Sequence, residues 1–196
     1  MVIMITGASH TGKTILAQRM LEKYKYPYLS LDHLKMGLIR SGYTDLTAED
    51  DDELTEYMWP IVREIIKTAI ENEQNLIIEG CYIPTHWRKD MDNSYLEFIE
   101  FICLAMTEEY IEDHFNEIIG HESDLEARLI KEDCMIDDIK QCNRWFIDAF
   151  GNAGERVVLV EGDYDKTVAS LLADKSEFVW KVDVWETVTP WMVIIH

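Results

Sequence analysis

Residues 7–14 form a short loop whose types and spacing suit the binding of phosphate groups. They match the pattern G-x-x-x-x-G-K-[ST] in full and comprise Gly7, Ala8, Ser9, His10, Thr11, Gly12, Lys13 and Thr14. Glycine at positions 7 and 12 lets backbone N–H groups turn inward and surround phosphate oxygens. Lys13 supplies a full positive charge to the β- and γ-phosphates, and the Thr14 hydroxyl suits Mg²⁺. The loop therefore predicts binding of a nucleoside triphosphate and Mg²⁺, with His10 either a variable position or a phosphate contact.

The overall charge requires such a local site for any anion. The 196-residue chain carries 38 acidic and 18 basic side chains, a formal net charge of −20. Such a surface repels nucleic acid and anionic lipid, so we expect neither as a partner. Its 47% apolar content fits a folded globular protein rather than a disordered one. An anionic ligand must therefore be held by local donors, in a pocket.

Apolar runs and helix-like periodicities alternate along the chain and indicate the frame that positions this loop. We expect strands at 2–6, 26–31, 75–78, 98–105 and 156–160, and helices at 14–24, 47–70, 107–119, 123–130 and 135–150. Thr47 is expected to cap the second helix, and Pro60 to kink or break it. The pattern predicts a three-layer α/β domain over 1–175, with a five-stranded parallel sheet covered by helices on both faces. Residues 176–196 form an extension, either an added strand pair or a subunit contact of a homodimer.

Two further segments strengthen the interpretation when taken with the loop. Leu29-Ser30-Leu31-Asp32-His33-Leu34-Lys35 ends the second expected strand, and Leu76-Ile77-Ile78-Glu79-Gly80 ends the third. Together with Gly-Ala-Ser-His-Thr-Gly-Lys-Thr, they resemble the P-loop kinases of nucleotides and small metabolites. These include adenylate kinase, shikimate kinase, chloramphenicol phosphotransferase, zeta toxins and 2-phosphoglycerate kinase. The resemblance covers about residues 1–165 and implies a P-loop NTPase fold, ATP and Mg²⁺ as cofactors, and a small-molecule phosphoryl acceptor.

The resemblance also implies roles for the two strand-end carboxylates. Carboxyl ends of parallel strands meet at one crevice, so Gly7, Asp32 and Glu79 should lie together. Asp32 would orient the acceptor hydroxyl as it attacks phosphorus, or else simply cap the following helix. Glu79 would complete the Mg²⁺ shell with Thr14 and line the acceptor site, or else be a structural carboxylate at a turn.

Basic residues should grip the acceptor and the transferring phosphoryl group. Lys35 and Arg40, in an acceptor-binding insert at about 33–74, either bind an acidic acceptor or are solvated cations. In the family, a lid after the fourth strand supplies arginines, and here the lid would span about 120–145. Unlike adenylate kinase, this chain has no arginine in 107–119, so Arg128 becomes the catalytic candidate and Arg144 the second. Each is otherwise a surface arginine paired with an acid such as Glu126 or Asp148.

Remaining features point to structure rather than chemistry. The acidic run 50–52 suits a solvated helix start that would also repel anions from that edge. The four cysteines, Cys81, Cys103, Cys134 and Cys142, lack zinc-site spacing, which predicts a reduced, cytoplasmic protein. No leader peptide or membrane span is expected.

The predicted function is an ATP- and Mg²⁺-dependent kinase of a small molecule. The alternative is a nucleotide-binding switch or toxin-like effector without a metabolic substrate.

Overall fold

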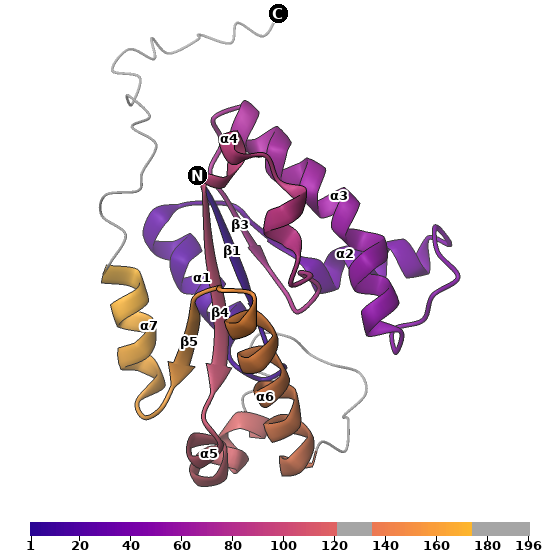
Figure 1. Cartoon of the computed structure of the whole chain (residues 1–196). Helices are drawn as coiled ribbons and strands as arrows, with labels where there is room; N and C mark the ends of the chain where they lie inside the picture. Colours follow the sequence, from indigo (N-terminus) through magenta and orange to yellow (C-terminus); the bar gives the residue numbers. More distant parts are fainter. Residues whose placement is uncertain (121–134, 174–196) are drawn as a thin grey trace, which may run out of the picture.

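Five parallel strands form the centre of the computed structural model, which describes residues 1–120 and 135–173 (Figure 1). The sheet has the order β2-β3-β1-β4-β5. The strands are β1 (Val2–Gly7), β2 (Tyr28–Ser30), β3 (Leu76–Glu79), β4 (Ile99–Met106) and β5 (Val157–Val160). Their short runs of Val, Ile and Leu are typical of strands that are covered on both faces. All five predicted strands are present, within two residues of their predicted bounds.

Helices cover both faces of this sheet, as the three-layer prediction requires. They are α1 (Lys13–Tyr24), α2 (Leu31–Arg40), α3 (Asp51–Glu71), α4 (Asn93–Leu96), α5 (Glu108–Gly120), α6 (Ile136–Asn152) and α7 (Tyr164–Ala173), with a 3₁₀ turn η1 at Trp87–Asp90. The predicted fold class is confirmed.

Alternation along β1 divides the core into two layers. Val2 and Met4 belong to an apolar cluster that includes buried residues of α3 and α6. Ile3 and Ile5 belong to a second cluster with buried residues of α1, α5 and α7. Because successive strand residues point to opposite faces, each cluster lies on its own side of the sheet. The rigid sheet between them positions the loops at its carboxyl edge.

For the helix predicted at 47–70, the expected cap at Thr47 is wrong, and no break occurs at Pro60. It begins at Asp51 with Asp50 as its N-cap residue, and no side-chain capping bond is made there. Thr47 instead forms a turn before the helix, where its backbone N–H and hydroxyl donate to Asp50 Oδ2 at 2.7 and 2.9 Å. α3 also continues through Pro60 without a break. Its buried neighbours Met58, Trp59 and Val62 anchor the helix on both sides of the proline.

Several predictions fall on residues that the structure does not describe. The helix expected at 123–130, Arg128 and the extension 176–196 lie entirely outside the described residues, and the lid at about 120–145 lies partly outside them. The division into a domain and an extension therefore stays a prediction. Within the described chain, no helix is long and apolar enough to span a membrane.

Candidate nucleotide and acceptor site

The loop between β1 and α1 has the backbone geometry of a phosphate cradle. Gly7 has φ 144°, and a Cβ there would lie 1.9 Å from the carbonyl oxygen of Leu104. Gly12 has φ 78° in the left-handed region, and His10 adopts φ 64° although it has a side chain. Such positive φ values turn backbone N–H groups toward a common centre. The glycines are required here by conformation and by space.

Side chains brace the loop from within. Thr11 Oγ1 donates to the carbonyl oxygen of Ala8 at 2.9 Å, and Lys13 Nζ donates to the same oxygen at 2.6 Å. The ammonium group is thereby folded back over the loop. α1 begins at Lys13, and its N-cap Gly12 offers no side chain to the N–H groups of the first turn. This uncapped helix start and the adjacent ammonium fit a phosphate chain.

Two oxygen-bearing side chains meet beside the loop. The Thr14 hydroxyl donates to Glu79 Oε2 at 3.5 Å, and Glu79 is only 1% exposed. The strand register pairs Ile5 with Glu79, so the end of β3 lies directly beside β1. A hydroxyl and a carboxylate are ligands that Mg²⁺ favours. In the described chain, no group of three or more His, Cys, Asp or Glu residues could hold a metal, so Mg²⁺ here would need phosphate or water oxygens as well.

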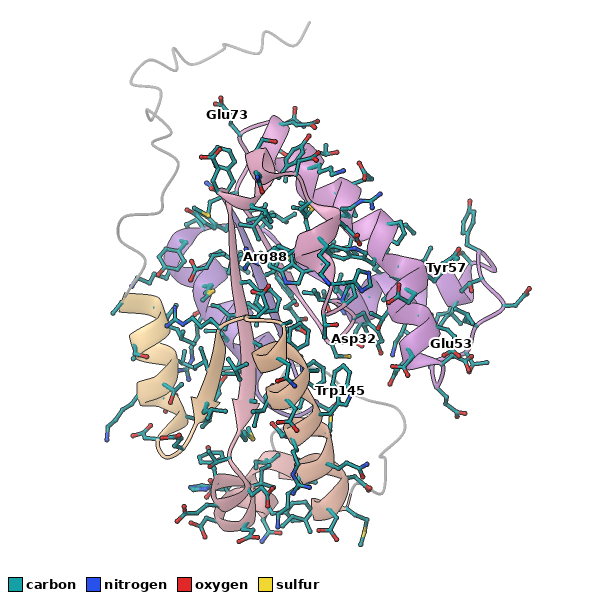
Figure 2. The ribbon with its side chains drawn as sticks, viewed as in Figure 1. Asp32, Glu53, Tyr57, Glu73, Arg88 and Trp145 are labelled. Atoms are coloured by element: carbon teal, nitrogen blue, oxygen red, sulfur yellow. The ribbon has the colours of Figure 1, made fainter. Side chains whose placement is uncertain are left out.

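Acidic side chains stand in the first turns of both α2 and α3. Asp32 lies in the first turn of α2, where Ser30 is the N-cap residue and no side-chain capping bond forms. The structure therefore does not show the capping role considered for Asp32. Figure 2 shows Asp32 at the same side of the molecule as Glu53 in the first turn of α3, whereas Glu73 lies at the opposite end.

Lys35 connects these elements through a tyrosine. Its Nζ lies 3.7 Å from Asp32 Oδ1 and donates a hydrogen bond to the Tyr82 hydroxyl. The Tyr82 hydroxyl in turn donates to Asp51 Oδ1 at 2.9 Å. Tyr82 itself is 3% exposed. The chain Asp32–Lys35–Tyr82–Asp51, called here the acceptor network, ties α2 to α3 through the segment that follows β3.

Charges of the loop and of the acceptor network act on the same residues. Burial raises the pKa of the Cys81 thiol to about 11, while the nearby Lys13 ammonium lowers it and Asp32 and Asp51 raise it. Burial, followed by the charges of Cys81, Asp32 and Asp51, raises the pKa of Tyr82 far above its ordinary value. Lys13, Asp32 and Asp51 are therefore all near enough to Cys81 to act on its thiol, so the phosphate loop and the acceptor network approach the same segment.

Sequence reasoning missed Tyr82 and Asp51. Asp51 was visible only as part of an acidic helix start, and Tyr82 only as one aromatic residue after Glu79-Gly80-Cys81. Lys35 and Tyr82 are 47 residues apart in the sequence, and Asp51 and Tyr82 are 31 residues apart. A pattern confined to one segment carries no signal for such a chain of bonds.

Arg40 and Arg144, two of the predicted basic site residues, do not lie beside Asp32 as Lys35 does. Arg40 lies exposed in the last turn of α2, eight residues or about 12 Å along the helix from Asp32. Arg144 is exposed and forms an ion pair with Glu108, which fits the alternative of a surface arginine paired with an acid. The structure thus brings Lys35 to Asp32 but does not bring Arg40 there.

A tyrosine that follows β5 packs against the phosphate loop. The Tyr164 hydroxyl donates to the carbonyl oxygen of Gly12 at 2.8 Å. Arg19 forms a 2.7 Å ion pair with Asp165 and lies 6.0 Å from the centre of the Tyr164 ring. The start of α7 therefore contacts the phosphate loop directly, a contact that the sequence analysis did not foresee.

Comparison with known proteins adds evidence on the fold. No family profile and no curated protein matches the sequence. The crystal structure of a sugar kinase from Janibacter sp. HTCC2649 aligns with a TM-score of 0.51 and 16% identity, over 88% of this chain and 92% of that chain. The chain has the fold of the P-loop small-molecule kinases.

Other structures resemble this kinase fold to a similar degree. An uncharacterized protein from Eubacterium ventriosum ATCC 27560 aligns with a TM-score of 0.50 and 12% identity, over 88% of this chain and 96% of that one. A gluconokinase from Sinorhizobium meliloti 1021 gives 0.49 and 14%, over 88% and 89%. At these identities the likeness concerns the fold alone, and the activity and its acceptor are left to the chemistry of the site.

Proposed function

We propose that this protein is an ATP- and Mg²⁺-dependent kinase that transfers the γ-phosphoryl group to a hydroxyl of a small molecule. One observation carries the proposal. The phosphate loop, the Thr14–Glu79 pair and Asp32 lie together at the carboxyl edge of the sheet. Open α/β sheets bind their ligands at this edge.

Each group of residues at this edge has a separate role in phosphoryl transfer. Backbone N–H groups of residues 7–14 and the Lys13 ammonium hold the phosphates of ATP, and Thr14 with Glu79 holds Mg²⁺, which offsets charge on the phosphate oxygens. Asp32 orients the acceptor hydroxyl and takes its proton. A bond then forms between the acceptor oxygen and the γ-phosphorus, the bond from that phosphorus to the bridging oxygen breaks, and ADP leaves. Arg128 is the proposed cation for the transferring group.

The proposed compartment is the cytoplasm. Three described cysteines, Cys81, Cys103 and Cys142, are thiols outside any disulfide. This state fits a reducing environment. A homodimer stays a proposal that the mass of the protein in solution would test.

Phosphorylation of a metabolite extract tests the function and finds the acceptor. Purified protein, Mg²⁺ and ATP are incubated with the extract, and mass spectrometry searches for products that gain one phosphoryl group. We expect such a product with the intact protein and not with Lys13→Ala or Asp32→Asn. Lys89→Ala, which changes an exposed lysine of η1, is the matched control and should behave as the intact protein. ATP binding without any phosphorylated product would overturn the kinase and favour the switch or effector.

A further inference from the structure

Lys35 is the cation nearest to Asp32, and it is already engaged. Its side chain is only 12% exposed, and it lies 3.7 Å from Asp32 Oδ1. Its ammonium also donates to the Tyr82 hydroxyl and lies 4.7 Å from the centre of that ring. The Asp32 carboxylate balances the charge of the ammonium, and the Tyr82 hydroxyl accepts a hydrogen bond from one of its three N–H groups. The ammonium of Lys35 is thus already paired with a carboxylate of the protein and is not held free for an anionic ligand.

Carboxylates outnumber cations in the acceptor network. Asp32 and Asp51 contribute two negative charges, against the single positive charge of Lys35. Tyr82 adds none, because burial raises its pKa and keeps the phenol protonated. The network is therefore net negative, and it belongs to a protein of net charge −20. Asp52 and Glu53 follow Asp51 in the first turn of α3 and add to the same sign.

Three other described cations form bonds elsewhere or lie away from the acceptor network. Lys13 donates to the carbonyl oxygen of Ala8 within the phosphate loop. Arg88 forms two hydrogen bonds with Glu155, at 2.8 and 2.7 Å. Arg40 lies exposed at the far end of α2. Lys35 is thus the cation that is bonded within the acceptor network, through Asp32 and Tyr82.

We propose that the acceptor is an uncharged polyhydroxyl molecule, bound through its hydroxyl groups by the network Asp32–Lys35–Tyr82–Asp51. The inference rests on the proposed kinase function and specifies its substrate class. Hydroxyl groups both donate and accept, so they can donate to Asp32 and Asp51 and accept from Lys35. An acceptor carrying a carboxylate or phosphate would bring its charge against two aspartates. An ammonium group on the acceptor only donates hydrogen bonds, so it could not accept one from Lys35.

Fractionation of the acceptor pool by charge tests the substrate class. The metabolite extract is separated on anion and cation exchangers into anionic, cationic and uncharged fractions, and each is incubated with the intact protein, Mg²⁺ and ATP. We expect a phosphorylated product from the uncharged fraction. A product from the anionic or the cationic fraction alone would overturn this inference and leave the kinase standing. If the unfractionated extract also yields no product, the kinase itself fails.

Charge variants then test the residues of the network. The identified acceptor is compared with a carboxylate analogue of the same skeleton by their kcat/KM values. Asp51→Asn removes one charge while its amide oxygen still accepts from Tyr82, so the relative kcat/KM for the carboxylate analogue should rise about 3- to 10-fold. Asp52→Asn, the same change one residue further along α3, should have a smaller effect. An equal effect of both variants, or none, contradicts the assignment.

Salt dependence provides a measurement on the unaltered protein. Raising the ionic strength screens charge, so it should increase the kcat/KM of the carboxylate analogue relative to that of the uncharged acceptor. The opposite trend would show attraction of the anion and would overturn the proposal. This outcome does not depend on whether any variant folds.

Discussion

The Tyr164 hydroxyl donates a 2.8 Å hydrogen bond to the carbonyl oxygen of Gly12 and thereby joins the start of α7 to the end of the phosphate loop. The contact is close enough that a Cβ on Gly12 would lie 2.4 Å from that hydroxyl. Burial raises the pKa of Tyr164, so the phenol stays protonated and remains a donor. The last helix of the described chain therefore supports the loop that is proposed to hold ATP.

Removal of this hydroxyl should weaken both the fold and the loop. We expect Tyr164→Phe to lower the free energy of unfolding by about 1 kcal/mol, since one part-buried hydrogen bond is lost. We also expect ADP to bind a few-fold more weakly, measured by calorimetry beside urea unfolding. Tyr24→Phe is the matched control, because the Tyr24 hydroxyl donates to the carbonyl oxygen of Leu172, away from the loop. The control should lose stability alone. Equal ADP affinity in all three proteins would contradict the role of Tyr164.

The Thr14–Glu79 pair predicts a specific effect on the metal requirement. Glu79→Gln keeps the shape of the side chain but removes the charge that attracts Mg²⁺. We expect the Mg²⁺ concentration that gives half-maximal phosphoryl transfer to rise at least about tenfold, because metal affinity depends on ligand charge. Glu73→Gln, which lies just after the end of α3 and well apart from Asp32 in Figure 2, is the control. An unchanged Mg²⁺ requirement in Glu79→Gln would remove Glu79 from the metal site.

Local sequence patterns predicted the strands and the phosphate loop because their signals are local. Five apolar runs and one eight-residue motif are each complete within a single segment, and parallel strands bring their carboxyl ends to one edge. Asp32 and Glu79 could therefore be placed beside Gly7 without coordinates. The start of α3 was placed wrongly because Thr47 and Asp50 are both residues that favour helix caps, and only the surrounding packing decides between them.

Bonds between distant segments could not be predicted in this way. Tyr164 reaches Gly12 across 152 residues, and Lys35 reaches Tyr82 across 47. Such pairs depend on how α2, α3 and α7 pack on the sheet, which no single segment determines. The same reason explains why Lys35 and Arg40, equal candidates by residue type, differ in the structure: Lys35 bonds to Tyr82 from the middle of α2, whereas Arg40 lies exposed in its last turn.

An ion pair between the η1 turn and a buried carboxylate predicts a loss of stability remote from the proposed chemistry. Arg88 binds Glu155 through two hydrogen bonds, and the Glu155 side chain is 3% exposed, whereas that of Arg88 is 48% exposed. Arg88→Ala would leave a carboxylate buried without this partner, so we expect a loss of about 1–3 kcal/mol in the free energy of unfolding. Thermal and urea unfolding measure it, with kcat for the acceptor unchanged.

Two further variants separate this pair from a general surface effect. Arg63→Ala removes an arginine that pairs with the exposed Glu64 and should change stability by less than about 0.5 kcal/mol. The double variant Arg88→Ala/Glu155→Gln should recover part of the loss, since an amide costs less to bury than a charge. A double variant less stable than Arg88→Ala alone would show that the carboxylate does not need this arginine.

Cys103 in β4 predicts how stability should respond to alkaline pH. Burial raises the pKa of its thiol to about 12, although the Lys13 ammonium lowers it, and the residue is 0% exposed. A thiol whose folded pKa exceeds its unfolded value holds its proton more tightly in the folded state. Its contribution to stability is therefore complete below about pH 8.5, the ordinary thiol pKa, and is lost as the pH rises toward 12.

Paired measurements of unfolding and labelling check this linkage. The free energy of unfolding in urea should fall more between pH 8 and pH 10.5 for the intact protein than for Cys103→Val, which has no thiol to ionise. In the folded protein at pH 8, iodoacetamide should label the partly exposed Cys142 before Cys103, because the thiolate is the reactive form and burial suppresses it. Labelling of Cys103 as fast as Cys142, or equal pH slopes for the two proteins, would show that the thiol is neither buried nor perturbed as the fold requires.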